Sequence, residues 1–477
     1  MGTMTVESYF LPGLETESAE TCTLTFGEAP EHVTLSFPVL TPVAVEALSQ
    51  RLLAAQAAHL AEQPIAEIID TIDRVVQLWL DPQYAYRQQA EALLPTITHY
   101  SAPMLRHGLD TLLRALRKDA LWRLLREELG DPLVLDTFRP RPHAGGLTRA
   151  YGPRLVTHIF SGNVPALPAW SLVCALLTKS ACLGKSASEE PLFAALFARS
   201  LWEVCPALGA CIAVSWWQGG DTALEAAAFA PAGAVIAYGS ETTMRDIQRR
   251  VPAPTRLVAY GHKLSFGVIG REALRPEQAA GTARQAAYGV SVFDQQGCVS
   301  PHLLYVERGG AVSPREFATL LAEGMAEVHA ELPRGPLPFA DSAAIRQVRG
   351  TYECRQLTDD RVLLLCSEPG TAWTVIYEED APFMASCLNR TVRVQPVDDI
   401  AEVVSHLQSA RSYVQTAGVA VPAPRLTGLA EALGRLGVTR LCALDRMPWP
   451  AITWHHDGRG NLLDLLRWTD IEVDTHA

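Results

Sequence analysis

Short apolar strands alternate with amphipathic helices through the middle of the chain, and this alternation restricts the fold more than any other feature. From residue 155, the strand-like segments LVTHIF, ACLGK, ACIAVSW and GAVIAYG are separated by the helix-like segments PALPAWSLVCALLTK, EPLFAALFARSLWEV and DTALEAAAFA. Parallel strands need long crossover connections, and helices usually supply them on both faces of the sheet. The pattern therefore predicts an α/β fold with a Rossmann-like, nucleotide-binding sheet. The GxGxxG fingerprint is absent after the first strand, so that motif does not support dinucleotide binding.

Two further regions flank this segment. Residues 41–130 show helical periodicity of Ala and Leu with interspersed charges, which predicts a helical layer in front of the sheet. Residues 264–440 form a second α/β block, with predicted strands HLLYVE and RTVRVQPV and predicted helices at 276–288, 314–329 and 398–409.

The chain of 477 residues is too long for one compact core and suits two or three domains, a size that favours an enzyme. We expect residues 1–262 to combine the N-terminal helical layer with the Rossmann-like domain. We expect residues 263–440 to form the second α/β domain, and 441–477 to pack back on the protein or to serve oligomerisation.

Charge and hydropathy exclude several classes of partner. The formal net charge of -12 disfavours broad nucleic-acid binding, which depends on Lys and Arg facing phosphates. The most apolar long stretch, 164–183, contains Pro165, Pro168 and Lys179, so it predicts a buried helix and a strand rather than a membrane span. With no export signal at the N-terminus, we expect a cytoplasmic protein.

A metal site is not expected. The ten Cys residues form no CxxC pair and no Cys/His cluster at zinc spacing. His455, His456 and Asp457 are adjacent, but neighbouring side chains on an extended chain point to opposite faces, so a structural turn is the favoured interpretation.

Cys298 is a candidate nucleophile. It lies in SVFDQQGCVSPHLLYVE, where Gly297 allows a sharp bend and a strand-like stretch follows. A thiol on a turn at a sheet edge can ionise and attack a carbonyl, whereas Cys174 and Cys182 have apolar neighbours that hold them neutral. A purely structural thiol remains the alternative from the local sequence.

Asn163 is a candidate oxyanion donor. In FSGNVPALPAW a predicted strand ends at Phe160, Ser161 and Gly162 turn the chain, and Pro165 can open a helix. Asn163 would therefore stand at the carboxyl end of a strand, where open α/β sheets bind ligands. Its amide is a neutral donor that can stabilise an oxyanion, and a helix-capping Asn is the alternative.

Five motifs in order resemble one known family. SGNVP, ACLGKSASEEP, AYGSETT, YGHKLSF and FDQQGCVSP are similar to the acyl-CoA reductase family of the bacterial luminescence fatty-acid reductase, a branch of the aldehyde dehydrogenase superfamily. The resemblance is strong over 155–305 and weaker through LNRTVRV to PWPAITWHHDG, while 9–144 agrees only in general character. It implies an aldehyde dehydrogenase-like fold with a Rossmann-like cofactor domain, an α/β catalytic domain and a helical N-terminal layer.

The resemblance also implies roles for individual residues. Cys298 matches the family nucleophile, which makes 263–440 the catalytic domain, and Asn163 matches the oxyanion-stabilising Asn. Lys185 matches the Lys that hydrogen-bonds the adenosine ribose. The remaining expected cofactor contacts are Gly239 and Ser240 near the pyrophosphate, together with Ser161 and Gly220.

Ser188 bears on the choice of cofactor. It falls where relatives that prefer NAD often carry a Glu that holds the ribose 2′-OH. A small neutral side chain leaves room for a 2′-phosphate, and Lys185 could offset its charge, so the resemblance favours NADPH over NADH.

Two departures from ordinary aldehyde dehydrogenases bear on the reaction. VAYGHKLSF places Ala259 or Tyr260 where those enzymes carry the Glu that acts as general base, so water is poorly activated to hydrolyse a thioester intermediate. CLNRTVRV replaces the segment of their second Glu, against the nicotinamide ribose. We expect NADPH-dependent reduction of a fatty acyl-CoA, or a similar acyl carrier, to the aldehyde.

Two alternatives stay open: an aldehyde dehydrogenase working in the oxidative direction, and a catalytically silent acyl-binding protein. The family implies acyltransferase and synthetase proteins as partners, and the superfamily implies a homo-oligomer.

Overall fold

The computed structural model describes residues 4–14, 20–28, 32–143 and 145–472. The chain forms two compact units. The first comprises Met1–Thr98, Leu109–Gly261 and Ala451–Ala477, and the second comprises His99–Gly108 and His262–Pro450. Among the described residues, no helix combines the length and the hydropathy that crossing a membrane requires.

The first unit begins with a small sheet and a layer of helices. The sheet has the order β1-β3-β2. Helix α2 presents Ile65, Ile69, Ile72 and Trp79 to the interior, at the spacing of one helical face. The elements of this region are β1 (Met4–Glu7), β2 (Thr21–Phe26), β3 (Val33–Pro38), α1 (Pro42–Ala55), η1 (Gln56–Leu60), α2 (Ile65–Leu80), α3 (Ala85–Thr98), α4 (Ala102–Arg114), α5 (Lys118–Leu129) and η2 (Pro132–Leu135). The helical N-terminal layer predicted from the sequence is present.

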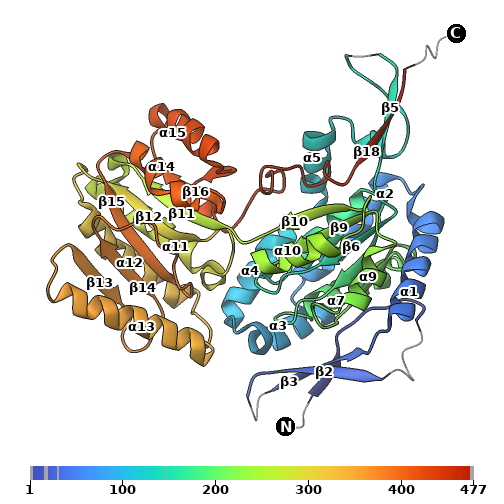
Figure 1. The fold of residues 1–477 in the computed structure, drawn as a ribbon, viewed down its shortest axis with the longest axis horizontal. Helices are drawn as coiled ribbons and strands as arrows, with labels where there is room; N and C mark the ends of the chain where they lie inside the picture. Colours follow the sequence, from blue (N-terminus) through green and yellow to red (C-terminus); the bar gives the residue numbers. More distant parts are fainter. Residues whose placement is uncertain (1–3, 15–19, 29–31, 144, 473–477) are drawn as a thin grey trace. The chain divides into compact units, whose positions relative to one another are not determined.

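A five-stranded parallel sheet forms the centre of the first unit, with helices around it (Figure 1). Its order is β10-β9-β6-β7-β8, and the central strands are buried along their whole length, as continuous apolar runs predict. The elements are β6 (Leu155–Ile159), α6 (Leu167–Leu177), β7 (Ala181–Lys185), α7 (Phe193–Val204), α8 (Pro206–Gly209), β8 (Ile212–Ser215), α9 (Thr222–Phe229), β9 (Ala234–Tyr238), α10 (Glu241–Arg250) and β10 (Arg256–Tyr260). The strand and helix alternation predicted over this region is confirmed.

The end of the chain returns to the first unit. Strand β18 (Arg467–Ile471) pairs antiparallel with β5 (Leu147–Tyr151), which also pairs with β4 (Arg139–Pro140). Within the predicted C-terminal segment 441–477, residues 441–450 belong to the second unit and residues from 451 onward belong to the first. A role of this segment in oligomerisation stays a prediction.

The second unit is built on a seven-stranded sheet with the order β13-β14-β15-β12-β11-β16-β17. All its pairs are parallel except β13 with β14. The strands are β11 (Leu264–Ile269), β12 (Pro301–Glu307), β13 (Val362–Cys366), β14 (Thr374–Glu378), β15 (Thr391–Val397), β16 (Val414–Ala420) and β17 (Arg440–Cys442). The helices are η3 (Arg271–Ala273), α11 (Pro276–Ser291), η4 (Val292–Gln295), α12 (Pro314–Glu331), α13 (Phe339–Gln356), η5 (Ile400–Glu402), α14 (Val403–His406), η6 (Gln408–Ala410), α15 (Ala423–Leu436) and η7 (Leu444–Arg446).

Strand β12 shows how the two faces of this sheet are covered. Leu304 and Val306 pack in the cluster formed with α11 and α12, while Leu303 and Tyr305 pack in the cluster with α14 and α15. Figure 1 shows these helix pairs on opposite sides of the strands. Successive residues of a strand point to opposite faces, so a strand covered on both sides is apolar throughout.

The predicted helix at 398–409 is wrong in detail. The region folds as η5, the short helix α14 and η6. Its buried residues are Ile400, Val403, Leu407 and Ala410, so two of the three steps between them are three residues long. Three-residue steps match the period of a 3-10 helix better than that of an α-helix.

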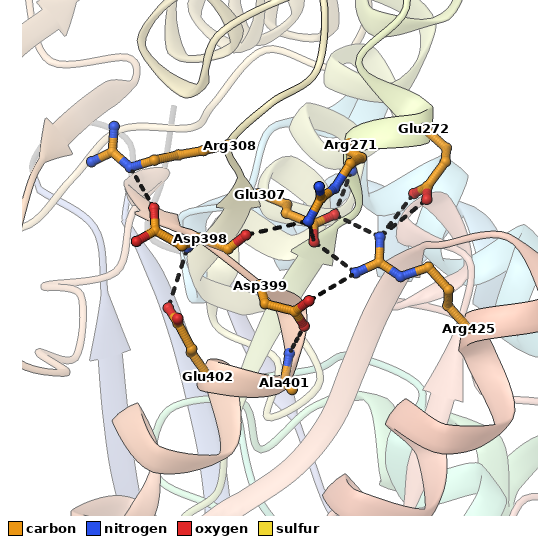
Figure 2. A network of polar contacts seen from close by, with 9 residues as sticks. All are labelled: Arg271, Glu272, Glu307, Arg308, Asp398, Asp399, Ala401, Glu402 and Arg425. Atoms are coloured by element: carbon orange, nitrogen blue, oxygen red, sulfur yellow. Dashed lines mark hydrogen bonds and ion pairs between the residues drawn. The ribbon is translucent and has the colours of Figure 1, made fainter.

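The carboxyl edge of the second sheet is held by charges around Glu307, the last residue of β12 (Figure 2). Its side chain is fully buried and accepts hydrogen bonds from Arg425 at 2.6 and 2.7 Å and from Arg271 at 2.7 Å, with the Arg271 amide at 2.8 Å. Burial alone would raise the pKa of Glu307, but the hydrogen bonds from Arg425 and Arg271 outweigh it and hold that pKa well below its usual range. This carboxylate therefore ties α15 and η3 to the end of β12.

Replacing Glu307 by Gln removes the buried carboxylate that Arg271 and Arg425 share, although Arg425 keeps Glu272 at 3.1 Å, and should lower the free energy of unfolding by about 3 kcal/mol at pH 7. Because the folded-state pKa is depressed, this stabilisation is present above the unfolded pKa of about 4.3 and is lost as pH falls towards the folded value. Urea unfolding of both proteins at pH 7 and pH 4 measures the difference, which should shrink at the lower pH.

Glu431→Gln is the matched control, because Glu431 forms an exposed pair with Arg435 at 3.5 Å. It should change the free energy of unfolding by no more than about 0.5 kcal/mol. Equal effects of the two substitutions would contradict the assignment to Glu307.

Candidate active site

The carboxyl ends of the first unit's parallel strands gather most of the candidate residues. The chain moves outward from β6 to β7 and β8, then returns to the other side of β6 with β9 and β10. Strand order therefore reverses between β6 and β9, and open α/β sheets bind ligands outside the carboxyl ends of the strands at such a point. Asn163 follows β6, Lys185 ends β7, and Gly239 follows β9.

The turn after β6 carries Ser161, Gly162 and Asn163. A Cβ on Gly162 would lie 2.8 Å from the Cβ of Glu189 and 2.9 Å from the amide nitrogen of Glu190, so only glycine fits this close approach. Asn163 is exposed. Helix α6 begins at Leu167 rather than at Pro165, with Ala166 as its N-cap, so Asn163 does not cap it. The capping alternative is wrong.

Lys185 lies almost buried at the end of β7. Its Nζ is 6.0 Å from the centre of the Trp217 ring, and a Cβ on Gly219 would lie 4.0 Å from the same nitrogen. Burial lowers the pKa of Lys185, against opposing effects of Glu225 and Glu189. The ammonium group therefore sits beneath the loop that follows β8.

Three buried polar atoms beside Lys185 have no hydrogen-bond partner among the described residues: Ser186 Oγ, Ser215 Oγ and Trp217 Nε1. The Ser186 amide donates to the Ser215 carbonyl at 2.9 Å, so the two serines follow neighbouring strands. Buried polar groups are normally paired, and an unpaired set at a strand end fits a ligand with hydroxyl groups. These residues therefore fit the ribose of a nucleotide cofactor.

Ser188 is exposed and accepts a hydrogen bond from Trp216 Nε1 at 3.1 Å. Glu189, also exposed, follows it in the chain. The position thus offers two small polar groups, the hydroxyl and the indole N–H, close to the end of β7.

Gly220 and the Gly239–Ser240 pair lie at the starts of α9 and α10. Gly220 has φ of 87°, in the region that favours glycine, and its amide donates to Glu225 at 2.9 Å. Ser240 caps α10 by accepting from the Thr243 amide at 3.2 Å. A helix N-terminus presents amide groups to anions, which suits a pyrophosphate near Ser240.

Cys298 lies in the second unit, at the amino edge of its sheet. Phe293, Asp294 and Gln295 all have positive φ, between 49 and 68°, so three left-handed residues turn the chain just before the cysteine. The Gln295 side-chain NH2 group donates to the backbone carbonyls of Pro301 at 2.8 Å and Thr391 at 2.9 Å. The backbone N–H of Thr391 donates to the Gln295 side-chain oxygen at 3.0 Å.

A buried ion pair supports the same turn. Arg390 Nε donates to Asp294 at 2.7 Å, and both side chains are almost fully buried. The register of β11 shifts at Ser265 against both neighbouring strands, and the Ser265 hydroxyl donates to the Cys298 carbonyl at 2.7 Å. The carbonyl of Cys298 is thus tied to β11, and the turn before the cysteine is tied to Arg390.

Burial separates Cys298 from the other cysteines that the sequence singled out. Cys298 is half-buried, whereas Cys174 and Cys182 are buried, and burial raises the pKa of both thiols well above its usual value. The prediction that these two are held neutral is confirmed.

The structure brings Asn163, Lys185, Ser188, Gly239 and the other cofactor candidates to one sheet edge. Asn163 belongs to the first unit and Cys298 to the second. Their meeting at one carbonyl therefore stays a prediction.

The structure adds residues that the sequence did not single out. They are Ser186, Ser215 and Trp217 in the first unit, and Ser265 and Gln295 in the second. The two serines could have been found, because Ser186 follows a predicted strand directly and Ser215 lies near the carboxyl end of another.

At the C-terminal motif, His456 stacks on Tyr260 with ring centres 4.1 Å apart and lies 4.7 Å from Trp454. Within the described ranges, no group of three or more His, Cys, Asp or Glu side chains is arranged to hold a metal ion.

The fold is that of the aldehyde dehydrogenases. It matches a NAD-dependent benzaldehyde dehydrogenase from Corynebacterium glutamicum with a TM-score of 0.73 and 17% identity, covering 98% of both chains. It also matches aldehyde dehydrogenase 21 from Physcomitrella patens with a TM-score of 0.76 and 14% identity, covering 100% of both chains. The fold class predicted from the motifs is confirmed.

The chain belongs to the acyl-CoA reductase (LuxC) family, whose sequence model matches residues 60–468. Relatives named long-chain acyl-protein thioester reductase include that of Vibrio harveyi, 26% identical over 354 residues, covering 73% of this chain and 71% of the relative. That of Aliivibrio fischeri is 26% identical over 415 residues, covering 85% and 82%. The family resemblance stated from the motifs is confirmed.

Proposed function

We propose that this protein is a cytoplasmic enzyme that reduces a fatty acyl-CoA, or an acyl-carrier thioester, to the aldehyde with NADPH through an acyl-enzyme on Cys298. The observation that carries the proposal is the half-buried Cys298 on a turn that Gln295 and Ser265 fix at the amino edge of the second sheet. A thiol on a rigid turn needs little reorganisation before attack.

In the first half-reaction, the Cys298 thiolate attacks the acyl carbonyl, and the oxyanion accepts hydrogen bonds from the Asn163 amide and the Cys298 backbone N–H. The tetrahedral species collapses and expels the thiolate of coenzyme A or of the carrier, leaving the acyl group on Cys298. A thiolate is a good leaving group, so this half needs no strong general acid.

A bound reduced nicotinamide supplies the hydride for the second half-reaction. Cys298 holds the acyl carbon in place as the thioester becomes a thiohemiacetal. Forming the thiohemiacetal takes up one proton, and its collapse to the aldehyde and the free thiol needs no further net proton.

The first unit supplies the groups that would hold the cofactor. Lys185, Ser186 and Ser215 would bind the adenosine ribose, and Ser240 at the start of α10 would face the pyrophosphate, with Ser161, Gly220 and Gly239 giving close backbone approach. Ser188 leaves room for the 2′-phosphate, which could accept from Trp216 Nε1.

The end of β10 supports reduction over hydrolysis. The general-base position falls on Ala259 or Tyr260, and the Tyr260 ring stacks on those of Tyr238 and His456, with ring centres 4.8 and 4.1 Å away. Burial raises the pKa of Tyr260 above its usual value, so its hydroxyl is not a base at neutral pH. The acyl-enzyme would thus wait for hydride.

The acyl donor is either coenzyme A or a carrier protein. The names of the relatives refer to long-chain acyl-protein thioesters, which supports a long chain held by a protein, with an acyltransferase or synthetase as its source. Comparing the reaction rate with acyl-CoA and NADPH to the rate with aldehyde and NAD separates reduction from oxidation. A Cys298 that resists alkylation would indicate a catalytically silent acyl-binding protein.

Cys298→Ala should abolish both acylation and reduction, because it removes the sulfur proposed to carry the acyl group. Radioactive acyl-CoA and gel autoradiography measure the first, and NADPH absorbance the second. Cys354→Ala, at an exposed cysteine on α13, should retain both. Stable labelling of Cys298→Ala would exclude the assignment.

Asn163→Ala should lower kcat/KM for the thioester by about a hundredfold or more, the usual scale for one oxyanion donor, while the Kd of NADPH stays unchanged. Steady-state kinetics and fluorescence titration of the nucleotide give the two values. A loss below about tenfold would remove Asn163 from the oxyanion site.

Ser188→Glu should reverse the cofactor preference, since a carboxylate repels a 2′-phosphate and accepts from a 2′-OH. We expect the ratio of kcat/KM for NADPH to that for NADH to fall by about tenfold or more. Ser188→Ala serves as the control and should keep the ratio of the wild type. A wild type that already favours NADH would contradict the cofactor assignment.

A further inference from the structure

Arg440 lies near the nucleophile at the amino edge of the second sheet. It begins β17, where it pairs with Thr416 of β16. The Thr416 amide donates to the Ser265 hydroxyl at 3.3 Å, and that hydroxyl donates to the Cys298 carbonyl. Starting from β12, the strand order is β12-β11-β16-β17, so the edge runs without a gap from Cys298 to Arg440.

The guanidinium of Arg440 is almost buried, with 9% of the residue exposed, and is held by backbone carbonyls. It donates to Met447 at 2.8 Å, to Arg446 at 2.6 Å and to Trp449 at 3.3 Å. These three carbonyls fix the orientation of the guanidinium.

Arg440 and Cys298 interact through their charges. Burial lowers the pKa of Arg440, while the negative charges of Cys442 and Cys298 raise it. Coulombic attraction acts equally on both partners, so the same interaction favours the ionised thiol. Arginine remains protonated throughout the pH range in which proteins are stable.

We propose that Arg440 is a positioning residue that stabilises the thiolate of Cys298 and so keeps the nucleophile ready for the acyl thioester. The inference rests on the proposed function and names the group that activates its nucleophile. The thiol of a free cysteine is half ionised near pH 8.5, so only a few per cent is thiolate at pH 7. The thiolate is the form that attacks. A fixed guanidinium supplies this activation without a titrating base.

Other titratable groups lie around the pair. Cys442 follows Arg440 on β17, and Asp445 and Arg446 of η7 act on Cys442. On the other side, His302 of β12 lies close enough to His262 for their charges to interact. Burial lowers the pKa of His302 to about 4, so it is neutral near pH 7.

The test is the pH dependence of alkylation of Cys298 in the full-length protein, followed with iodoacetamide by mass spectrometry of the peptide that contains it. In the wild type, the pH at which the alkylation rate of Cys298 reaches half its maximum, here called the midpoint, should be about 7.5 or lower. Arg440→Met should raise it by about one unit or more, whereas Arg440→Lys, which keeps the charge, should stay within about half a unit. Both substitutions disturb the three carbonyl contacts, so a merely structural role would move the two variants together.

Arg435→Met is the matched control, because it removes an exposed guanidinium from α15 and should leave the midpoint unchanged. A wild-type midpoint above about 7.5, or equal midpoints for the Met and Lys variants, would overturn the proposal. If Arg440→Met does not fold, as its melting temperature will show, Arg440→Gln replaces it, because this variant also removes the charge and should raise the midpoint by a similar amount.

Acyl labelling distinguishes this inference from the proposed function. Arg440→Met should regain acylation of Cys298 at pH 9.5, where the thiol ionises without help. Absence of acylation in the wild type at every pH would refute the function while leaving the midpoints intact. Acylation with an ordinary midpoint would refute only the role of Arg440.

Discussion

The turn before Cys298 depends on one fully buried amide side chain, that of Gln295. Its bonds to Pro301 and Thr391 bridge β12 and β15 before their own ladder begins at Leu303 and Arg393, so the side chain acts as one further rung of the sheet. Left-handed residues without glycine cost of order 1–3 kcal/mol each, and they persist only where the surroundings determine them. Gln295 supplies that determination, and the position of Cys298 follows from it.

The two edges of the second sheet serve different purposes. The amino edge carries Cys298 among polar contacts that orient it, whereas the carboxyl edge is tied by the carboxylate of Glu307 and its arginines. The first unit reverses this arrangement, because its polar candidates lie at the carboxyl ends of the strands. In each unit, the candidate residues therefore gather at one edge of the sheet.

Much of the architecture follows from the sequence, and the exceptions have physical causes. Buried parallel strands are largely apolar runs, so β6, β7 and β12 could be predicted from the sequence. The same runs placed Lys185 at the end of β7 and Asn163 after β6. Strand β17 has only three residues and carries no periodicity, so Arg440 could not be placed. The left-handed residues 293–295 include no glycine, so the sequence does not predict this turn. Tertiary hydrogen bonds rather than local preference hold it.

The buried hydroxyls of Ser186 and Ser215, which have no hydrogen-bond partner among the described residues, impose a cost on the fold. A buried polar group without a partner destabilises a fold by about 1–3 kcal/mol, and an apolar residue of similar size would remove that penalty. Selection for heat resistance alone would therefore tend to erase these serines. Their retention in thermostable descendants would be a sign that a bound molecule compensates them, and their loss would mark lineages in which occupancy no longer matters.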